Sequence, residues 1–268
     1  MLVTVLLFLG ACASDDGDYD ERPVGEIYNT AWEALKEGKL IKAAQEFDEV
    51  ERQHPYSVWA GRAMIMAAYA HYKQNAYDET IIAAQRYISL FPGNEAAAYA
   101  HYLIALSHYE QISDVERDQK STEQALVALQ EIVRRYPQSE YAQDARFKID
   151  LTFDHLAGKE MAVGREYQKK NSYVAAIGRF SNVINRYQTT SHAAEALHRL
   201  TESYMALGVL DEARAVAAVL GHNYPDSEWY QDSYNLLVEK GVSLEAFANE
   251  QSLNPSSQDR KPSASEDS

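Results

Sequence analysis

A short pattern recurs along this chain and constrains its fold more than any other feature. A ring residue followed by proline closes the pattern at His54-Pro55, Phe91-Pro92, Tyr136-Pro137 and Tyr224-Pro225, and Tyr187-Gln188 fits the same slot without proline. Small residues lie twelve positions before the second residue of each closing pair, at Ala43, Thr80, Ala125, Ala176 and Ala213. Because proline cannot continue a helix, each closing pair marks the end of a helix. The recurrence indicates a repeat protein.

The spacing of the closing positions identifies the repeat class. Positions 55, 92, 137, 188 and 225 lie 37, 45, 51 and 37 residues apart, room for two helices and a turn each time. Spacings near the tetratricopeptide (TPR) period of about 34 residues favour stacked helix hairpins. We therefore predict an all-α solenoid of about five TPR-like hairpins. Their expected ranges are 24–54, 58–91, 95–136, 140–187 and 191–224, with a capping helix at 228–239.

The turns inside the hairpins carry a second mark. Gly38, Asn75, Asn171 and Gly208 lie seventeen residues before four of the closing positions. These residue types tolerate the left-handed conformation that a helix exit usually needs. The third interval carries a polar insertion at 113–120, and the fourth is extended across 141–170, which predicts a long helix. We expect two sub-stacks, 24–138 and 139–247.

The first residues predict export and a lipid anchor. Residues 1–11 are uncharged and nearly all apolar, too short to span a bilayer but suited to a signal peptide. Leu9-Gly10-Ala11-Cys12 resembles the bacterial lipobox, and Cys12 is the only cysteine. The resemblance implies cleavage before Cys12, S-diacylglycerol and N-palmitoyl groups on it, and an outer-membrane destination facing the periplasm. Residues 12–23 are expected to be a flexible tether and 248–268 a disordered tail.

Composition argues against two partner classes. The chain has 25 basic and 40 acidic residues, a formal net charge of −15. Nucleic-acid binding is therefore not expected, since no basic patch would neutralise phosphates. Electrostatic binding to a membrane is disfavoured for the same reason, so membrane attachment depends on the lipid.

A tyrosine-rich stripe is the candidate binding groove. Offsets from the closing positions place a set of aromatic and basic residues on the concave faces of the first helices: Tyr28, Trp32, Arg62, Tyr69, Tyr72, Lys73, Tyr99, Tyr102 and Tyr109. Tyrosine combines a stiff ring with a hydroxyl, which suits an extended peptide, and Arg62 and Lys73 could pair with a terminal carboxylate. The alternative is that these rings pack the helices together, as aromatic stripes often do.

The combined features resemble the BamD family. They are the lipobox, Gly-Glu-Ile-Tyr-Asn at 25–29, five TPR-like pairs, the insertion, and the stretch that contains Tyr167, residues 173–176 and Arg179. The resemblance covers residues 9–225. It implies a lipoprotein of the machine that folds β-barrels into the outer membrane, together with other assembly lipoproteins. The carboxy-terminal repeats would dock on the POTRA region of the barrel subunit, and the amino-terminal repeats would hold unfolded substrates.

Arg179 is the candidate contact to the barrel subunit under this resemblance. It lies next to Phe180, which is expected to face inward, so Arg179 is expected to face outward. The alternative is that Arg179 is solvated or paired with a neighbour, as exposed arginines usually are.

No catalytic, cofactor or metal motif is recognised. The eight histidines show no His-Glu-x-x-His spacing, and His101 and His108 share only a helix face. Glu202-Ser203-Tyr204 resembles the catalytic start of lytic transglycosylases, but the downstream Gly-Leu-Met-Gln portion is absent. A non-enzymatic binding protein is expected. The rival to barrel assembly is a periplasmic TPR lipoprotein that scaffolds cell-wall synthesis or division proteins.

Overall fold

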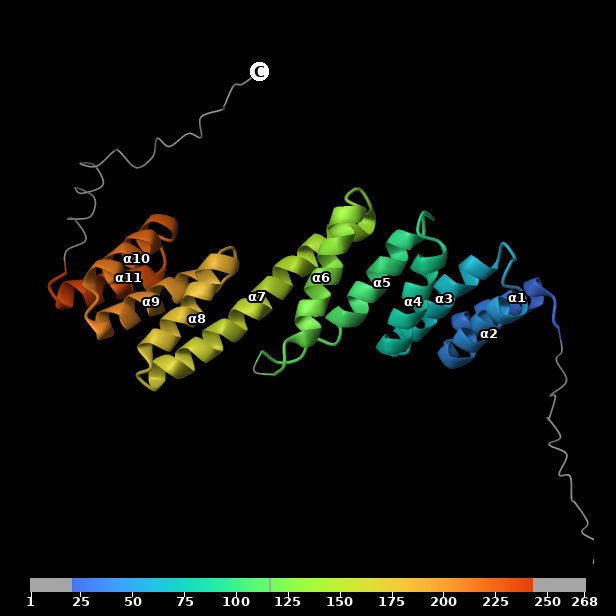
Figure 1. Ribbon diagram of the computed structural model, residues 1–268, viewed down its shortest axis with the longest axis horizontal. Coiled ribbons are helices and arrows are strands. Elements are labelled where there is room, and N and C mark those ends of the chain that lie inside the picture. The colour runs from blue at the N-terminus through green and yellow to red at the C-terminus, as the bar shows by residue number, and fades with distance from the viewer. Residues whose placement is uncertain (1–20, 116, 243–268) are drawn as a thin grey trace, which may run out of the picture. The chain divides into compact units, whose positions relative to one another are not determined.

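The computed structural model describes residues 21–115 and 117–242, and this part of the chain consists of helices joined by turns and loops, without strands (Figure 1). The expected all-α class is confirmed. Cys12, the signal peptide at 1–11, most of the tether and the tail at 248–268 lie outside the described residues. None of the described helices is long and apolar enough to cross a membrane.

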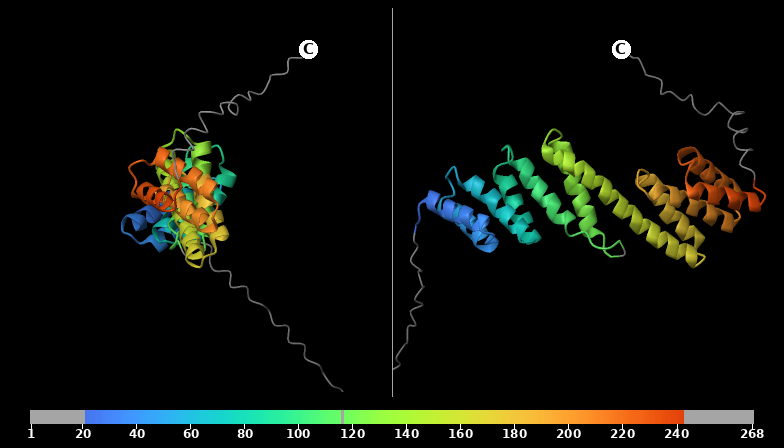
Figure 2. Two further views of the ribbon diagram at one scale, coloured as in Figure 1. Left: turned by 90° about the vertical axis from the view of Figure 1, so that its left-hand side faces the viewer. Right: turned by 180° about the vertical axis from the view of Figure 1, so that it is seen from behind.

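The eleven helices of the described residues follow the predicted pairs closely. Each predicted range contains two helices joined by a short turn, except the third, whose helices are separated by the insertion. The helices are α1 (Val24–Lys36), α2 (Leu40–Gln53), α3 (Ala60–Lys73), α4 (Tyr77–Leu90), α5 (Ala97–Tyr109), α6 (Lys120–Arg135), α7 (Glu140–Lys169), α8 (Tyr173–Arg186), α9 (Ala193–Leu207), α10 (Leu210–Asn223) and α11 (Glu228–Glu239). Figure 2 shows the same helices from two further sides.

The chain forms two compact units, one ending at Ala100 and the other beginning at His101. The sequence-based boundary at 138 lies inside the second unit. The reason is α7, which continues for 30 residues and packs on both α6 and α8. The amino-terminal unit contains α1 to α4 and the start of α5, and the carboxy-terminal unit contains the rest.

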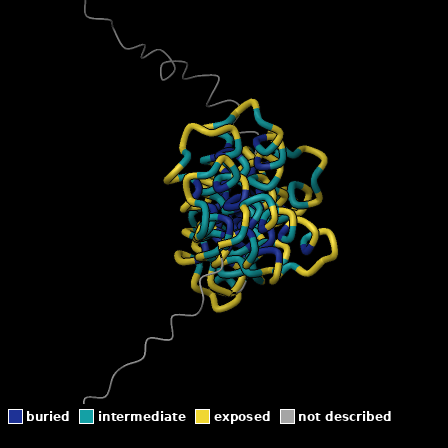
Figure 3. Tube along the Cα trace, turned by 90° about the vertical axis from the view of Figure 1, so that its right-hand side faces the viewer, coloured by how far each residue is buried: buried dark blue, intermediate teal, exposed yellow. Residues whose placement is uncertain are grey.

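The recurring small residues lie in the core. Ala43, Thr80, Ala125, Ala176 and Ala213 are fully buried, and so are the residues four positions later: Phe47, Ala84, Leu129, Phe180 and Ala217. Residues four apart share a helix face, so each pair presents one buried stripe to the neighbouring helices. Figure 3 colours the trace by burial, and the exposed stretches are mostly at the outer turns.

The predicted turn residues adopt the left-handed conformation. Gly38 and Gly208 have φ of 74°, Asn75 has 60° and Asn171 has 58°. Both asparagine turns are closed by a tyrosine two residues later, which donates its hydroxyl to the asparagine Oδ1. The donor–acceptor distance is 3.1 Å from Tyr77 and 2.9 Å from Tyr173.

The end of the solenoid is covered as predicted. Helix α11 packs on α9 and α10, and its Leu237 is fully buried. Ser227 caps the helix by accepting a hydrogen bond from the Trp229 backbone at 3.2 Å. A capping helix of this kind closes the apolar face that an open-ended stack would otherwise leave exposed.

Candidate functional site

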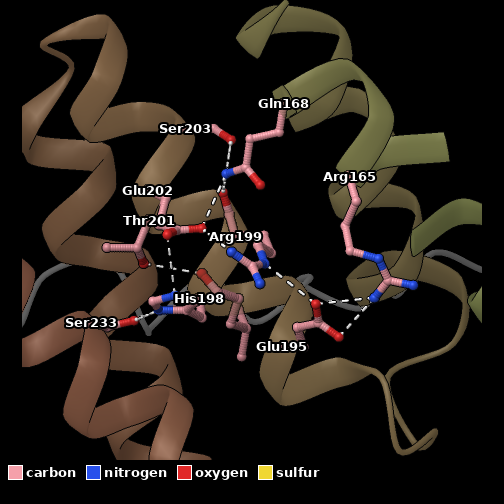
Figure 4. Close-up of polar contacts among 10 residues, drawn as sticks. Arg165, Gln168, Glu195, His198, Arg199, Thr201, Glu202, Ser203 and Ser233 are labelled. Atoms are coloured by element: carbon pink, nitrogen blue, oxygen red, sulfur yellow. Dashed lines mark hydrogen bonds and ion pairs between the residues drawn. The ribbon is translucent and has the colours of Figure 1, made fainter. Parts of the chain in front are cut away.

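Polar side chains from α7, α9 and α11 meet in one network of the carboxy-terminal unit (Figure 4). Its centre is α9, where Glu195, Arg199 and Glu202 share a face because they are spaced by four and three residues. Arg199 donates from Nε to Glu195 Oε1 at 3.3 Å and from Nη1 to Glu202 Oε2 at 2.8 Å. One guanidinium therefore joins the two carboxylates.

Helix α7 attaches to this centre through two side chains. Arg165 Nη1 donates to both oxygens of Glu195, at 3.0 and 2.9 Å. Gln168 Nε2 lies 3.2 Å from Glu202 Oε2, 3.3 Å from Ser203 Oγ and 3.4 Å from the carbonyl oxygen of Arg199. These contacts fix α7 against α9 and set the orientation of the Gln168 amide.

Helix α11 joins the network through a buried histidine. His198 of α9 is only 5% exposed; its Nδ1 lies 2.8 Å from Ser233 Oγ, and its Nε2 lies 3.5 Å from Glu202 Oε1. The Trp229 ring of α11 covers both His198, at 5.3 Å between ring centroids, and the Arg199 guanidinium, at 5.4 Å. The network thus connects three helices, and its histidine is satisfied on both nitrogens.

The electrostatics of the network favour fixed charges. Burial by itself raises the pKa of Glu202, but hydrogen bonds from His198 and Arg199 outweigh it and lower the pKa to about 2. For Arg199, burial lowers the pKa, yet the hydrogen bonds to Glu202 and Glu195 raise it overall. A general acid of the transglycosylase kind needs a raised carboxyl pKa. Glu202 therefore serves recognition or structure better than proton transfer.

A pocket opens beside the network, between the end of α7, the start of α8 and α9. Its volume is about 400 Å³. The lining residues are Arg165, Gln168, Lys169, Tyr173, Arg199, Glu202 and Ala206. Three cations against one carboxylate make this wall suited to a negatively charged ligand.

Arg179 occupies the position that the sequence predicts. It lies on α8 next to the fully buried Phe180, and its own side chain is 41% exposed. Its Nη1 lies 3.3 Å from Glu160 Oε1 on α7, and Asn182 Nδ2 donates to the other oxygen of Glu160 at 3.1 Å. The ion pair with Glu160 matches the alternative in which Arg179 pairs with a neighbour. The rest of the Arg179 side chain stays exposed to solvent. A role in partner binding stays a prediction.

In the amino-terminal unit, half-buried Tyr28 packs against the helix core. Its ring centroid lies 5.4 Å from Phe47, edge to face, and 4.7 Å from Trp59. Burial raises the pKa of its hydroxyl. The Arg62 guanidinium lies over the Trp59 ring, 5.9 Å from its centroid. Tyr28 thus follows the packing alternative, whereas Trp32 is 39% exposed, with Lys36 Nζ 5.5 Å from its ring.

The remaining stripe residues divide between the two units. Tyr69, Tyr72 and Tyr99 are half-buried in the amino-terminal unit, where Lys73 is exposed and the Tyr72 ring lies 6.1 Å from Tyr77. Tyr102 and Tyr109 belong to the carboxy-terminal unit and face α7. Tyr102 donates its hydroxyl to Asp144 Oδ2 at 2.6 Å, and Lys148 Nζ lies 5.2 Å from the Tyr109 ring. These two tyrosines fasten α5 to α7.

His101 and His108 line a pocket of about 530 Å³ between α5 and α6. Burial lowers the pKa of His101, and its Nε2 is buried with no hydrogen-bond partner among the residues that the structure describes. Within the described residues, no group of three or more histidine, cysteine, aspartate or glutamate side chains could hold a metal ion.

Sequence reasoning missed the pocket of Arg165, Lys169 and Arg199. A signal was available on α9, since Glu195, Arg199 and Glu202 follow the spacing of mutually paired charges. The position of Arg165 opposite Glu195 depends on how α7 packs on α9. That packing could not be obtained from spacing alone.

Residues 20–220 match the model of the family described as YfiO, outer membrane lipoprotein. The match covers well over half of the chain. The chain belongs to this family. Membership associates it with the outer membrane and confirms the resemblance found in the sequence.

Three relatives of this family are named outer membrane protein assembly factor BamD, and none of the three is named as an enzyme. The relative from Caulobacter vibrioides is 54% identical over 224 residues, covering 84% of this chain and 73% of the relative. The relative from Rickettsia prowazekii is 44% identical over 237 residues, with 88% and 94% covered. The relative from Neisseria meningitidis serogroup A is 31% identical over 244 residues, with 85% and 91% covered.

Among solved structures, the chain is similar to a tetratricopeptide repeat protein from Parabacteroides merdae. The TM-score is 0.39 at 16% identity, and the similarity covers 88% of this chain and 80% of that one.

Proposed function

We propose that this chain is a non-catalytic, lipid-anchored subunit of the machinery that assembles β-barrel proteins in the outer membrane. The observation that carries the proposal is the 54% identity to a relative named as an outer membrane protein assembly factor, over most of both chains. A helical solenoid with exposed faces and no recognised catalytic motif suits a subunit that binds other proteins. The anchor would be acylated Cys12, holding the folded part at the periplasmic face.

The carboxy-terminal unit would dock on the POTRA region of the barrel subunit, with Arg179 as a contact. Glu160 holds the Arg179 guanidinium in place, while its 41% exposure leaves donors for an acidic partner group. Charge-assisted bonds of this type give orientation as well as affinity. Other lipoproteins of the assembly would join the same complex.

The experiment is co-purification of the barrel subunit from detergent extracts with tagged full-length chain. Arg179→Glu should reduce recovery of the barrel subunit, because the new carboxylate repels the partner group, while the helical circular dichroism stays unchanged. Arg186→Glu is the matched control, since Arg186 is an exposed arginine of the same helix and should leave recovery intact. Equal recovery with both variants would remove Arg179 from the interface.

The same purification distinguishes barrel assembly from the rival role. Recovery of cell-wall synthases or division proteins, with no POTRA-bearing barrel protein, would replace the proposal by a scaffold. Mass spectrometry of the purified chain tests the anchor: the proposal requires an amino-terminal Cys12 that carries diacylglycerol and an additional acyl chain. An unprocessed leader with a free thiol would contradict that part.

The amino-terminal unit would hold segments of unfolded outer-membrane proteins. Its half-buried Tyr69 and Tyr72, with exposed Lys73 near the end of the same helix, combine stacking area, hydroxyl groups and one cation. A photo-crosslinking residue at position 69 should capture an unfolded barrel substrate. The same residue at exposed Glu79 of α4 is the control. Equal capture at both positions would count against a groove on α3.

A further inference from the structure

We propose that the pocket between α7 and α9 binds an acidic, extended peptide segment. Arg165 and Lys169 would bind a carboxylate of the peptide, and Gln168 Oε1 would accept a hydrogen bond from a peptide backbone N–H. This pocket includes neither Arg179 nor the groove on α3 proposed above. The class of its ligand follows from the donors and acceptors of the pocket that make no hydrogen bond to other described residues.

The first support is the set of donors that the network leaves unused. Arg165 employs only Nη1 in its bond to Glu195, so its Nε and Nη2 make no hydrogen bond within the described residues, and its side chain is 43% exposed. Lys169 is exposed and makes no ion pair in the same described part of the chain. These groups line one pocket, where a carboxylate can be bound by charge-assisted hydrogen bonds.

The second support is that the competing carboxylates are already engaged. Glu202 accepts from Arg199 and Gln168, and Glu195 accepts from Arg199 and Arg165. Neither carboxylate is paired with Lys169. The pocket therefore presents a local excess of positive charge in a chain whose formal net charge is −15. A locally cationic wall in a chain of negative net charge favours acidic ligands at this place.

The third support distinguishes a peptide from an inorganic anion. Gln168 must turn its amide nitrogen toward Glu202 Oε2 and the Arg199 carbonyl oxygen, because both are acceptors. Its Oε1 consequently lies on the other side of the amide, where Figure 4 draws no contact to the other residues shown, and is left as an acceptor. Phosphate in its ionised form has little to donate to such an oxygen, whereas a peptide backbone offers N–H groups.

The pocket also has the size and wall chemistry for a short peptide segment. Its volume of about 400 Å³ falls within the usual range for ligand pockets, about 300–1,000 Å³. Tyr173 adds an aromatic wall, fixed by its hydroxyl bond to Asn171 at 2.9 Å. The ligand would thus meet cations, an amide acceptor and an apolar ring that are already positioned.

The site is separate from the Arg179–Glu160 pair. Glu160 and Arg165 are five residues apart on α7, which places them about 140° apart around the helix axis. Binding at the pocket and docking through Arg179 can therefore be tested independently. Loss of one should leave the other intact.

The test is fluorescence anisotropy with the full chain and a labelled ten-residue peptide that contains several aspartates. Its twin with asparagine at the same positions is the ligand control. We expect saturable, salt-sensitive binding of the acidic peptide and none of the twin. Lys169→Gln should weaken binding by about threefold to tenfold, as expected for loss of one charge-assisted contact, and so should Arg165→Gln.

Lys170→Gln provides the matched protein control. Lys170 is the next residue, is exposed, and lies 3.9 Å from Glu166, but it does not line the pocket. Its replacement should change the affinity by less than about twofold, with unchanged circular dichroism in all variants. Equal weakening by Lys169→Gln and Lys170→Gln would overturn the proposal, because it would show charge attraction without a site. Equal binding of the twin, or full competition by millimolar phosphate, would overturn it as well.

Discussion

Gly164 of α7 lies directly against the ring of Phe180 of α8. A Cβ added to Gly164 would stand 2.5 Å from Phe180 Cε1, and Phe180 is fully buried. Gly164→Ala should therefore destabilise the carboxy-terminal unit. Overpacking costs about 1–3 kcal/mol, offset in part by about 1 kcal/mol of helix propensity, so a net loss of up to about 2 kcal/mol is expected. Urea unfolding followed by circular dichroism measures it.

Gly178→Ala is the control for this substitution. Gly178 lies within α8, and a Cβ there would meet nothing within 4 Å. The free energy of unfolding should rise by about 1 kcal/mol through helix propensity alone. Two glycines of neighbouring helices are thus expected to respond with opposite signs. A stabilised Gly164→Ala protein would contradict the close approach.

Ser233 determines whether α11 stays on α9. Ser233→Ala would leave the buried Nδ1 of His198 without its partner at 2.8 Å, which should cost about 1–3 kcal/mol. The loss should be visible as faster amide hydrogen exchange in α11. Asn235→Ala, at an exposed position of the same helix, should leave exchange unchanged. Similar exchange in both variants would mean that the His198 contact does not hold the cap.

The lowered pKa of Glu202 predicts how the stability of the carboxy-terminal unit changes as the pH falls. Its pKa in the folded state is about 2, below the ordinary value of 4.5. The ionised Glu202 carboxylate therefore contributes fully to the free energy of unfolding above about pH 4.5, and this contribution is lost as the pH falls toward 2. Unfolding midpoints measured across this window should fall less steeply for Glu202→Gln than for the unchanged chain. Glu239→Gln, at an exposed site, should keep the original slope.

Replacing Tyr102 and Tyr109 by phenylalanine should separate the contribution of a hydroxyl to the free energy of unfolding from that of a ring. Tyr102→Phe removes the hydrogen bond to Asp144 at 2.6 Å and should lower the free energy of unfolding by about 1 kcal/mol. Tyr109→Phe keeps the ring that faces Lys148 and should change it by less than about 0.5 kcal/mol. Equal effects in thermal unfolding would show that the hydroxyl of Tyr102 does not fasten α5 to α7.

Much of the fold could be predicted from local marks. The closing prolines set the helix ends, and Asn75 and Asn171 supplied the left-handed turns, because both effects act within a few residues. The alanine positions marked the core, since only small side chains let two helices approach closely. The continuation of α7 through residues 140–169 also followed from the length of its interval.

The site was less accessible to sequence reasoning, because its contacts join residues distant in the chain. Arg165 and Glu195 are 30 residues apart, and His198 and Ser233 are 35 apart. Helical periodicity placed Tyr102 on a face but did not say which helix the face meets. The answer, packing on α7 rather than open exposure, depends on Asp144, 42 residues later.

The length of α7 also affects how the carboxy-terminal unit comes apart. Thirty residues at 1.5 Å each give a rod of about 45 Å, on which α6, α8 and α9 all rest. In a solenoid built of equal hairpins, an end repeat can melt while its neighbours remain folded. Here the α7–α8 pair cannot fray without also releasing α6, which packs on the same long helix, so the part of the unit built on α7 should melt in one step under mechanical tension.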